Sequence, residues 1–156
     1  MWRPLRPFVC TLPACGLDPM RTLDLRVYWE DTDAGGVVYY ANYLKFFERA
    51  RTEWLRALGI EQQALREQTG AMFVVADVQV RYLVPARLDD LLRVTVKVLA
   101  NRQASLQIQQ EAWRGETLLA EGSVRVGCVD ANTLRPRRIP AAVLDAMESK
   151  RATPPL

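Results

Sequence analysis

Near residue 70 the spacing of the apolar residues in this chain changes from a helical period to a strand period. From about Tyr40 to Leu58 the spacing is three and four residues, which is typical of a helix buried on one side. The expected buried stripe contains Tyr43, Leu44, Phe47, Ala50, Trp54 and Leu58, and the opposite side carries Lys45, Glu48, Arg49, Thr52 and Arg56. A shorter helix is expected over 61–70, and it ends at a glycine.

After residue 70 the apolar residues alternate with polar ones, which is the pattern of half-buried strands. Strands are expected over 22–29, 72–84, 91–99, 105–113 and 118–129. In 72–84 the even positions from Val74 to Val84 are expected to face inward. Short connections between consecutive strands favour an antiparallel meander, and its apolar face must be covered. The sequence therefore predicts an α+β fold, a curved antiparallel sheet of about five strands wrapped around one long central helix.

The length of 156 residues suits one domain, which is expected over residues 22–148. Residues 1–21 are rich in proline and are expected to be a disordered extension, and 149–156 a tail. "LPACG" loosely resembles a lipoprotein cleavage site, but prolines interrupt the preceding segment, and translation from Met20 is an alternative. No apolar run approaches the ~20 residues that a membrane span needs.

The chain contains no histidine, and this excludes the usual Ser-His-Asp and Cys-His triads and histidine-ligated zinc. Three scattered cysteines, Cys10, Cys15 and Cys128, are too few for a thiolate metal site and favour reduced thiols in the cytoplasm. A net charge of +3 is too small to indicate nucleic-acid binding. Neither a metal nor a cofactor is expected, so any catalysis must use carboxylates, hydroxyls, amines or backbone dipoles.

The stretch "WEDTDAGGVVYYANY" (29–43) places acidic residues and a glycine pair directly before the long helix. The first turn of a helix has unpaired N–H groups and the positive end of the helix dipole. A carboxylate and an anion-stabilising site are therefore expected only a few residues apart. The residues alone favour the simpler interpretation that Asp31 and Asp33 form turns, because aspartate is common in such loops.

Two segments, "YWEDTDAGGVVYYANYLKFFERARTEWL" (28–55) and "VRYLVPARLDDLLRV" (80–94), resemble the hotdog-fold thioesterases of the 4-hydroxybenzoyl-CoA thioesterase-like family. The resemblance is to the Tol–Pal-associated acyl-CoA thioesterase (YbgC) branch. It covers about Leu23 to Ile139. In that branch a histidine commonly stands where this chain has Tyr40, whereas the 4-hydroxybenzoyl-CoA branch has tyrosine there.

The resemblance implies a thioester hydrolase that converts acyl-CoA to free acid and CoA. Asp33 would be the catalytic carboxylate, as nucleophile or as base, and Asp31 is expected to remain a turn-former. The backbone N–H near Tyr40 would bind the carbonyl oxygen, and Gly36, Val37 and Asn42 would contact substrate, although Asn42 could instead orient the loop. Contacts to CoA are expected from Arg102 and Ser105, with Arg87 and the arginines of 135–138 as alternatives.

The family also implies a homodimer or homotetramer, a cytoplasmic location and an acyl-CoA or acyl carrier protein substrate. A second hypothesis is a scaffold of the Tol–Pal envelope system that holds acyl carrier protein or other lipid-synthesis proteins, with vestigial hydrolysis and peripheral envelope association. Glu48 is the rival carboxylate, because another hotdog lineage uses a glutamate on the helix. Its spacing to Arg51 and Thr52 favours a structural ion pair instead. A hotdog dehydratase usually needs a histidine, which this chain lacks.

Overall fold

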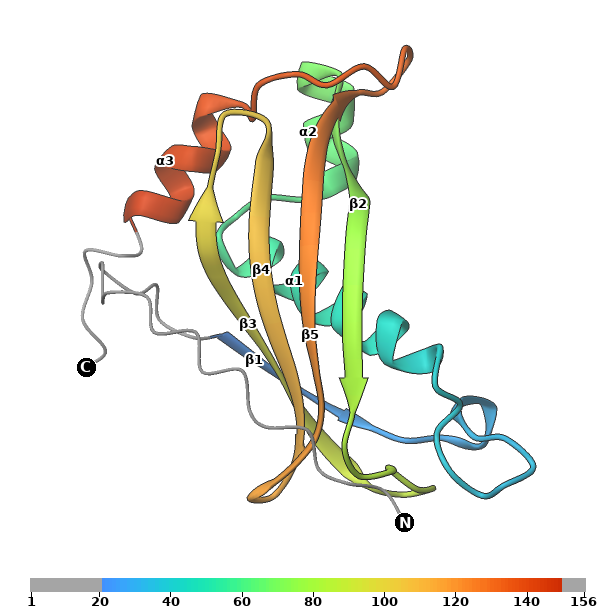
Figure 1. Cartoon of the computed structure of the whole chain (residues 1–156). Helices are drawn as coiled ribbons and strands as arrows, with labels where there is room; N and C mark the ends of the chain where they lie inside the picture. The colour runs from blue at the N-terminus through green and yellow to red at the C-terminus, as the bar shows by residue number, and fades with distance from the viewer. Residues whose placement is uncertain (1–20, 150–156) are drawn as a thin grey trace.

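The computed structural model describes residues 21–149 (Figure 1). Outside the described residues lie the predicted extension apart from Arg21, residues 150–156, and Cys10 and Cys15. The expectations about lipidation and about a start at Met20 concern the same undescribed part of the chain. The elements are β1 (Arg21–Arg26), the 3₁₀ turn η1 (Trp29–Asp31), α1 (Asn42–Ala57), α2 (Gln62–Thr69), β2 (Ala71–Tyr82), β3 (Leu91–Asn101), β4 (Ser105–Arg114), β5 (Thr117–Asp130) and α3 (Ala141–Ser149).

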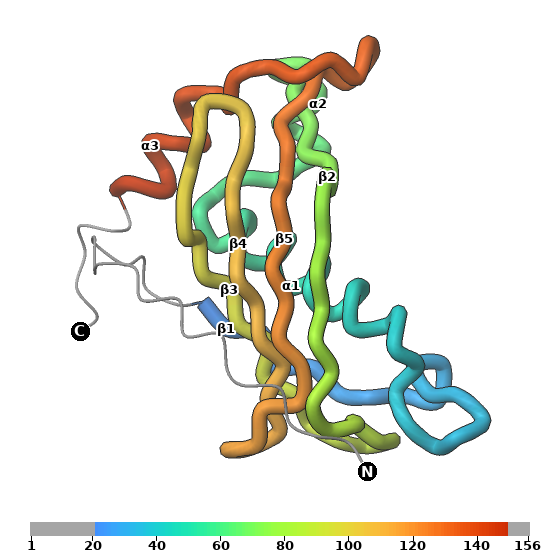
Figure 2. Tube along the Cα trace, viewed as in Figure 1, coloured from blue at the N-terminus to red at the C-terminus, as the bar shows by residue number. Residues whose placement is uncertain are grey.

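The strands form one antiparallel sheet in the order β1-β3-β4-β5-β2. The sheet is curved, and α1 crosses behind it in the view of Figures 1 and 2. The predicted fold class is therefore confirmed, but the expected meander holds only for β3, β4 and β5, because β2 pairs with β5 and not with β3. The first strand is shorter than expected, because the chain turns into η1 after β1, and α1 begins at Asn42 rather than Tyr40.

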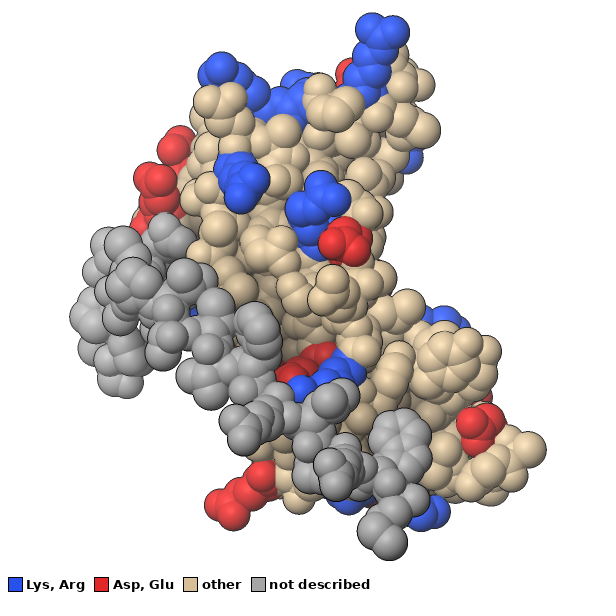
Figure 3. Space-filling view, viewed as in Figure 1, with Lys and Arg blue, Asp and Glu red and all other residues tan. Residues whose placement is uncertain are grey.

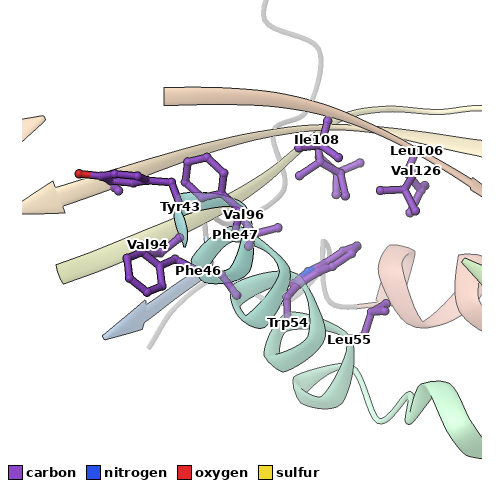
Figure 4. Close-up of a cluster of buried hydrophobic side chains, with 14 of the residues drawn as sticks. Tyr43, Phe46, Phe47, Trp54, Leu55, Val94, Val96, Leu106, Ile108 and Val126 are labelled. Carbon is purple, nitrogen blue, oxygen red and sulfur yellow. The ribbon is translucent and has the colours of Figure 1, made fainter. Parts of the chain in front are cut away.

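The core lies between α1 and the sheet (Figure 4). Tyr43, Phe46 and Phe47 point from the first turns of α1 toward the strands, and Trp54 and Leu55 do so from its last turns. Leu44 was predicted to be buried, but it is 39% exposed, whereas Phe46 is fully buried. Each helical residue is rotated about 100° from the one before, so Leu44 lies well off the face that carries Tyr43 and Phe47.

The predicted inward face of β2 is only half correct, because the strand contains a β-bulge at Ala76. Before the bulge Phe73 and Val75 lie opposite the buried Cys128 and Val126 of β5. After it the inward positions are even, as predicted, at Val78, Val80 and Tyr82. Directly opposite residues of an antiparallel pair face the same way, and one extra residue reverses the alternation. The prediction is therefore wrong for Val74 and Ala76.

One polar side chain lies inside the core. Gln110 of β4 has 0% exposure, and its Nε2 donates to the backbone oxygens of Phe47 at 3.0 Å and Thr95 at 3.3 Å. Its Oε1 accepts a hydrogen bond of 2.7 Å from Arg51 Nη1. Burial lowers the pKa of Arg51, with a smaller opposing effect from Glu48. These contacts tie the middle of α1 to the centre of the sheet.

Candidate functional site

The segment that joins β1 to α1 lies at the end of the sheet where β2 ends and β3 begins. Its backbone is attached there by Val27 N, which donates to Asp90 O at 3.0 Å, and by Val38 N, which donates to Ala86 O at 2.8 Å. In Figure 1 this segment protrudes as a loop beside the start of α1. The loop therefore presents its side chains next to the helix entrance.

Asp33 lies on the outer part of this loop and is exposed. Its Oδ1 accepts a hydrogen bond of 2.8 Å from Gly35 N. Its backbone closes the turn, because Asp33 N donates to Val37 O and Gly36 N donates to Asp33 O, both at 3.0 Å. Oδ2 has no hydrogen-bond partner within residues 21–149. The carboxylate is thus held by one oxygen, and the other is available to a ligand.

The glycine pair has a conformational purpose in this turn. Gly36 has φ of +72°, a region that residues with a Cβ adopt at a cost. A Cβ on Gly35 would lie 3.0 Å from Asp33 Oδ1. Val37 is half-buried and contributes its backbone oxygen to the turn. The structure therefore assigns Gly36 to the bend and Gly35 to the contact with Asp33.

Asp31 and Asn42 form a buried pair behind the loop, with 2% and 5% exposure. Asn42 Nδ2 donates to Asp31 Oδ1 at 3.0 Å, and Tyr28 N donates to Asp31 Oδ2 at 2.9 Å. Of the two roles expected for Asn42, this contact is the one that orients the loop. Asp31 does take part in a turn, but its burial was not expected from the sequence.

Tyr40 is 62% exposed and lies two residues before the start of α1. Its carbonyl oxygen accepts a hydrogen bond of 2.8 Å from Tyr82 OH. The backbone N–H groups of Tyr40 and Ala41 have no hydrogen-bond partner within the described part of the chain. These two N–H groups are the donors that a helix entrance offers to an anion or a carbonyl oxygen.

A hollow of about 280 Å³ adjoins Tyr40 and is lined by Val38, Tyr40, Tyr43, Tyr82, Leu83, Val84 and Pro85. The ring of Tyr82 meets those of Tyr40 and Tyr43 edge-on, with centroids 6.3 and 5.4 Å apart. Burial raises the pKa values of Tyr43 and Tyr82, so both hydroxyls stay protonated at neutral pH. Tyr82 was not predicted as a site residue, although it lies in the second of the two family-like segments.

Arg102 lies in the β3–β4 connection and Ser105 is the first residue of β4, and Arg102 N donates to Ser105 O at 2.8 Å. This is the opposite end of β3 from Asp33, and the 11 residues of β3 span roughly 35 Å. Figure 3 shows Lys and Arg side chains gathered at that end of the viewed face. The arginines of 135–138 belong to it too, because Arg137 Nη1 donates to Thr69 O at 2.8 Å. Of the alternatives for CoA, only Arg87 lies near Asp33.

A second cavity, of about 140 Å³, lies between the later turns of α1 and strands β2, β4 and β5. Its polar lining consists of Glu48, Arg51, Thr52 and Gln62. Thr52 Oγ1 donates to Glu48 Oε1, and Gln62 Nε2 donates to Thr52 Oγ1 at 3.0 Å. The expected ion pair of Glu48 with Arg51 is not formed among the described residues, because Arg51 Nη1 instead contacts Gln110.

Residues 21–149 contain neither a cluster of metal ligands nor a membrane-spanning helix. No group of three or more His, Cys, Asp or Glu side chains is placed to hold a metal ion. No helix there combines the length and the apolar character that crossing a bilayer requires. Cys128 lies in the core, and burial raises the pKa of its thiol.

Five antiparallel strands around one central helix define the hotdog class of proteins. The family model described as "Thioesterase-like superfamily" matches residues 27–147. Acyl-CoA thioesterase YbgC of Haemophilus influenzae is 46% identical over 127 residues, which are 81% of this chain and 93% of the relative. Acyl-CoA thioester hydrolase YbgC of Escherichia coli O157:H7 is 48% identical over 121 residues, 77% of this chain and 90% of the relative.

A solved structure supports the same assignment. The probable thioesterase from Bartonella henselae superposes with a TM-score of 0.74 at 33% identity, covering 78% of this chain and all of that one (100%). The chain belongs to the thioesterase-like superfamily, within the YbgC family of hotdog-fold thioesterases. The predicted family, fold and enzyme class, a thioester hydrolase, are thereby confirmed.

Proposed function

We propose that this chain hydrolyses the thioester of acyl-CoA, with Asp33 as nucleophile or base and the Tyr40 N–H as donor to the carbonyl oxygen. One observation carries the proposal: Asp33 Oδ2 and the N–H groups of Tyr40 and Ala41, none of which has a partner in the described part of the chain, belong to the same loop and helix entrance. The names of the Haemophilus and Escherichia relatives support acyl-CoA as the substrate class.

The chemistry needs only these groups. A thioester carbonyl is electrophilic and a thiolate is a good leaving group, so a histidine relay is dispensable. As nucleophile, Asp33 bonds to the carbonyl carbon, the C–S bond breaks, and water then cleaves the mixed anhydride. As base, Asp33 takes a proton from the water that attacks the same carbon. In both routes the Tyr40 N–H stabilises the negative oxygen at the positive end of α1.

The tyrosine-lined hollow is the proposed position of the acyl group. It lies directly beside Tyr40, and its walls are the rings of Tyr40, Tyr43 and Tyr82 together with aliphatic side chains. Aromatic and aliphatic walls bind apolar groups through burial of apolar surface. Gly36 and Val37, on the same loop, are the proposed backbone boundary of the substrate path.

The proposal includes a homodimer, because β2 forms an unprotected edge of the sheet. β2 has 12 residues and pairs only with β5 among the described strands, and Val75 and Val78 on it are 50% and 38% exposed. Long apolar edges are normally covered. Antiparallel pairing of β2 with a second copy about a two-fold axis would bury this edge. Light scattering at micromolar concentration should show at least two chains, and a monomer would contradict this part.

The same two-fold pairing would bring opposite ends of two copies together. β2 starts beside Arg137 and ends beside Tyr40, so the arginine-rich end of one copy would approach the Asp33 loop of the other. Arginine forks suit phosphate groups. We therefore place the CoA phosphates at the arginine-rich end, where Arg102, Ser105 and residues 135–138 lie.

The decisive experiment compares Asp33→Asn with the wild type on a panel of aromatic, short-chain and long-chain acyl-CoA substrates. Loss of hydrolysis by about 10²–10⁴-fold in kcat is expected. Asp89→Asn is the matched control, because Asp89 is an exposed turn acid with φ of +69°, which asparagine also tolerates. Turnover of Asp33→Asn at the wild-type rate would overturn the assignment.

The carrier and the cellular setting are part of the same proposal. CoA and acyl carrier protein present the same pantetheine thioester, so each acyl group should be tested on both. The resemblance also implies a cytoplasmic enzyme associated with the Tol–Pal system. Negligible turnover on every substrate, together with stable capture of acyl carrier protein, would favour the scaffold function instead.

A further inference from the structure

The buried pair Asp31–Asn42 is not explained by the proposed chemistry, since neither side chain is accessible to a ligand. A buried carboxylate is costly unless its oxygens accept hydrogen bonds. Here both do, from Asn42 Nδ2 at 3.0 Å and from Tyr28 N at 2.9 Å. Both residues of the pair are also hydrogen-bonded to Tyr39 through the backbone.

Three hydrogen bonds form a closed ring through residues 31, 39 and 42. Asn42 Nδ2 donates to Asp31 Oδ1, Tyr39 N donates to Asp31 O at 2.9 Å, and Asn42 N donates to Tyr39 O at 2.8 Å. Each of the three residues is thereby bonded to the other two. The ring is rigid because the side-chain contact is buried and the other two bonds are backbone bonds.

The ring determines the direction of one further group. The carbonyl of Tyr39 and the N–H of Tyr40 belong to the same peptide unit, which is planar and trans, so they point in opposite directions. Fixing Tyr39 O on Asn42 N therefore fixes the Tyr40 N–H, which has no partner among the described residues. We propose that Asp31 and Asn42 are positioning residues that aim the Tyr40 N–H at the reacting carbonyl oxygen.

This inference rests on the proposed function, because it assigns the Tyr40 N–H its role in hydrolysis. The oxygen becomes negative only in the transition state, so a misdirected N–H lowers kcat more than it raises KM. A displacement of the donor by about 1 Å is enough to cost up to ~10²-fold. A purely structural pair would instead change the melting temperature and leave kcat per folded molecule unchanged.

The test exchanges the donor and the acceptor between the two positions. Asn42→Asp sets two carboxylates against each other where the hydrogen bond of 3.0 Å now stands. In Asp31→Asn/Asn42→Asp the new amide can accept from Tyr28 N and donate to the new carboxylate, so every contact is restored. Asp31→Asn completes the double-mutant cycle. Each variant is assayed on acyl-CoA for kcat and KM, with melting temperature and circular dichroism as controls.

We expect kcat of Asn42→Asp to fall roughly 10- to 100-fold with KM within about threefold, and the double variant to recover most of it. At lower pH one of the two carboxyls takes up a proton and can donate to the other. The kcat of Asn42→Asp relative to the wild type should therefore rise on acidification. This pH series keeps the test decisive if Asn42→Asp is poorly folded at neutral pH.

Wild-type kcat in folded Asn42→Asp would overturn the inference, and so would a double variant that recovers stability but not kcat. These failures are distinct from a failure of the proposed function. If Asp33→Asn abolishes hydrolysis while the cycle shows no coupling in kcat, the positioning role alone is wrong. If Asp33→Asn retains hydrolysis, the site itself is wrong.

Discussion

The two candidate catalytic carboxylates, Asp33 and Glu48, differ in the groups that accompany them. At the entrance of α1, Asp33 has an oxygen without a hydrogen-bond partner among residues 21–149, and the N–H groups of Tyr40 and Ala41 likewise have no partner there. At the α1–sheet cavity, Glu48 accepts a hydrogen bond from Thr52, and the guanidinium of Arg51 is bound to Gln110. Apolar side chains form much of the wall of both this cavity and the tyrosine-lined hollow, so the apolar character of the walls does not distinguish them.

The difference shows that the backbone N–H donors, rather than the carboxylate itself, distinguish the candidate site from the cavity beside Glu48. Within a helix the backbone N–H groups are used by the preceding turn, whereas those of the first turn are not. Glu48 lies in the second turn of α1, where no free N–H can receive a developing oxyanion. Asp33 precedes the helix, where such donors exist.

The largest expected effect comes from removing each carboxylate in turn. Asp33→Asn should lower kcat by about 10²–10⁴-fold, whereas Glu48→Gln, which keeps an oxygen that can accept from Thr52, should change kcat by less than roughly threefold. Steady-state kinetics with one acyl-CoA substrate checks both. A large loss in Glu48→Gln beside an active Asp33→Asn would move the catalytic carboxylate to the cavity.

A smaller effect is expected from the turn that carries Asp33. Gly36→Ala places a Cβ at φ of +72°, which costs about 1–2 kcal/mol or shifts the turn. Gly59→Ala is the matched control at the other end of α1, with φ of +82° and equally open surroundings. Both should lower the melting temperature, but only Gly36→Ala should reduce kcat, by roughly 10-fold through displacement of Asp33.

The finding that would contradict this prediction is an equal loss of kcat in both glycine variants. Strain would then act on the fold as a whole, and the turn at 33–37 would have no special relation to hydrolysis.

The smallest expected effect on kcat comes from removing the hydroxyl of Tyr82, and it contrasts with the effect of removing that of Tyr43 in the same hollow. Tyr82→Phe removes the donor to Tyr40 O, and loss of a hydrogen bond worth about 0.5–1.5 kcal/mol should lower kcat by roughly 2- to 10-fold. Tyr43→Phe removes the acceptor for Ala86 N, a buried backbone donor, so it should lower the free energy of unfolding by about 1–3 kcal/mol. Kinetics and urea unfolding of both variants check this contrast, and a Tyr82→Phe enzyme with unchanged kcat would leave Tyr82 a packing role only.

Much of the fold could be predicted because hydrophobic period is a local property. In β3 every second residue from Leu92 to Val98 is buried, as expected, since that strand is central and regular over this stretch. In β2 the bulge at Ala76 could not be predicted, because it exists only in the pairing with β5. The burial of Phe46 in place of Leu44 likewise depends on how α1 is rotated against the sheet.

The candidate site likewise has one part that could be predicted from the sequence and another part that could not. Asp33, the glycines and the helix start are neighbours in sequence, so their proximity could be predicted from the sequence alone. The contact of Asp31 with Asn42 spans 11 residues, and that of Tyr82 with Tyr40 spans 42. Both require the loop to fold back on the sheet. The separation of Arg102 from Asp33 was also hidden, because sequence order does not tell which end of the sheet a connection occupies.

Gln110 has a consequence for how the helix can move. Its amide contacts a backbone oxygen in the middle of α1, where the hydrogen bond is buried, and the side chain of Arg51 one turn further on, where it is partly buried. A shift of α1 by one turn along the sheet, about 5.4 Å, would break both of these contacts and leave the buried amide only its hydrogen bond to Thr95 O. The apolar contacts around it are far less selective for position. The helix therefore has a single axial setting against the sheet, and its first turn keeps a fixed height relative to the loop that carries Asp33.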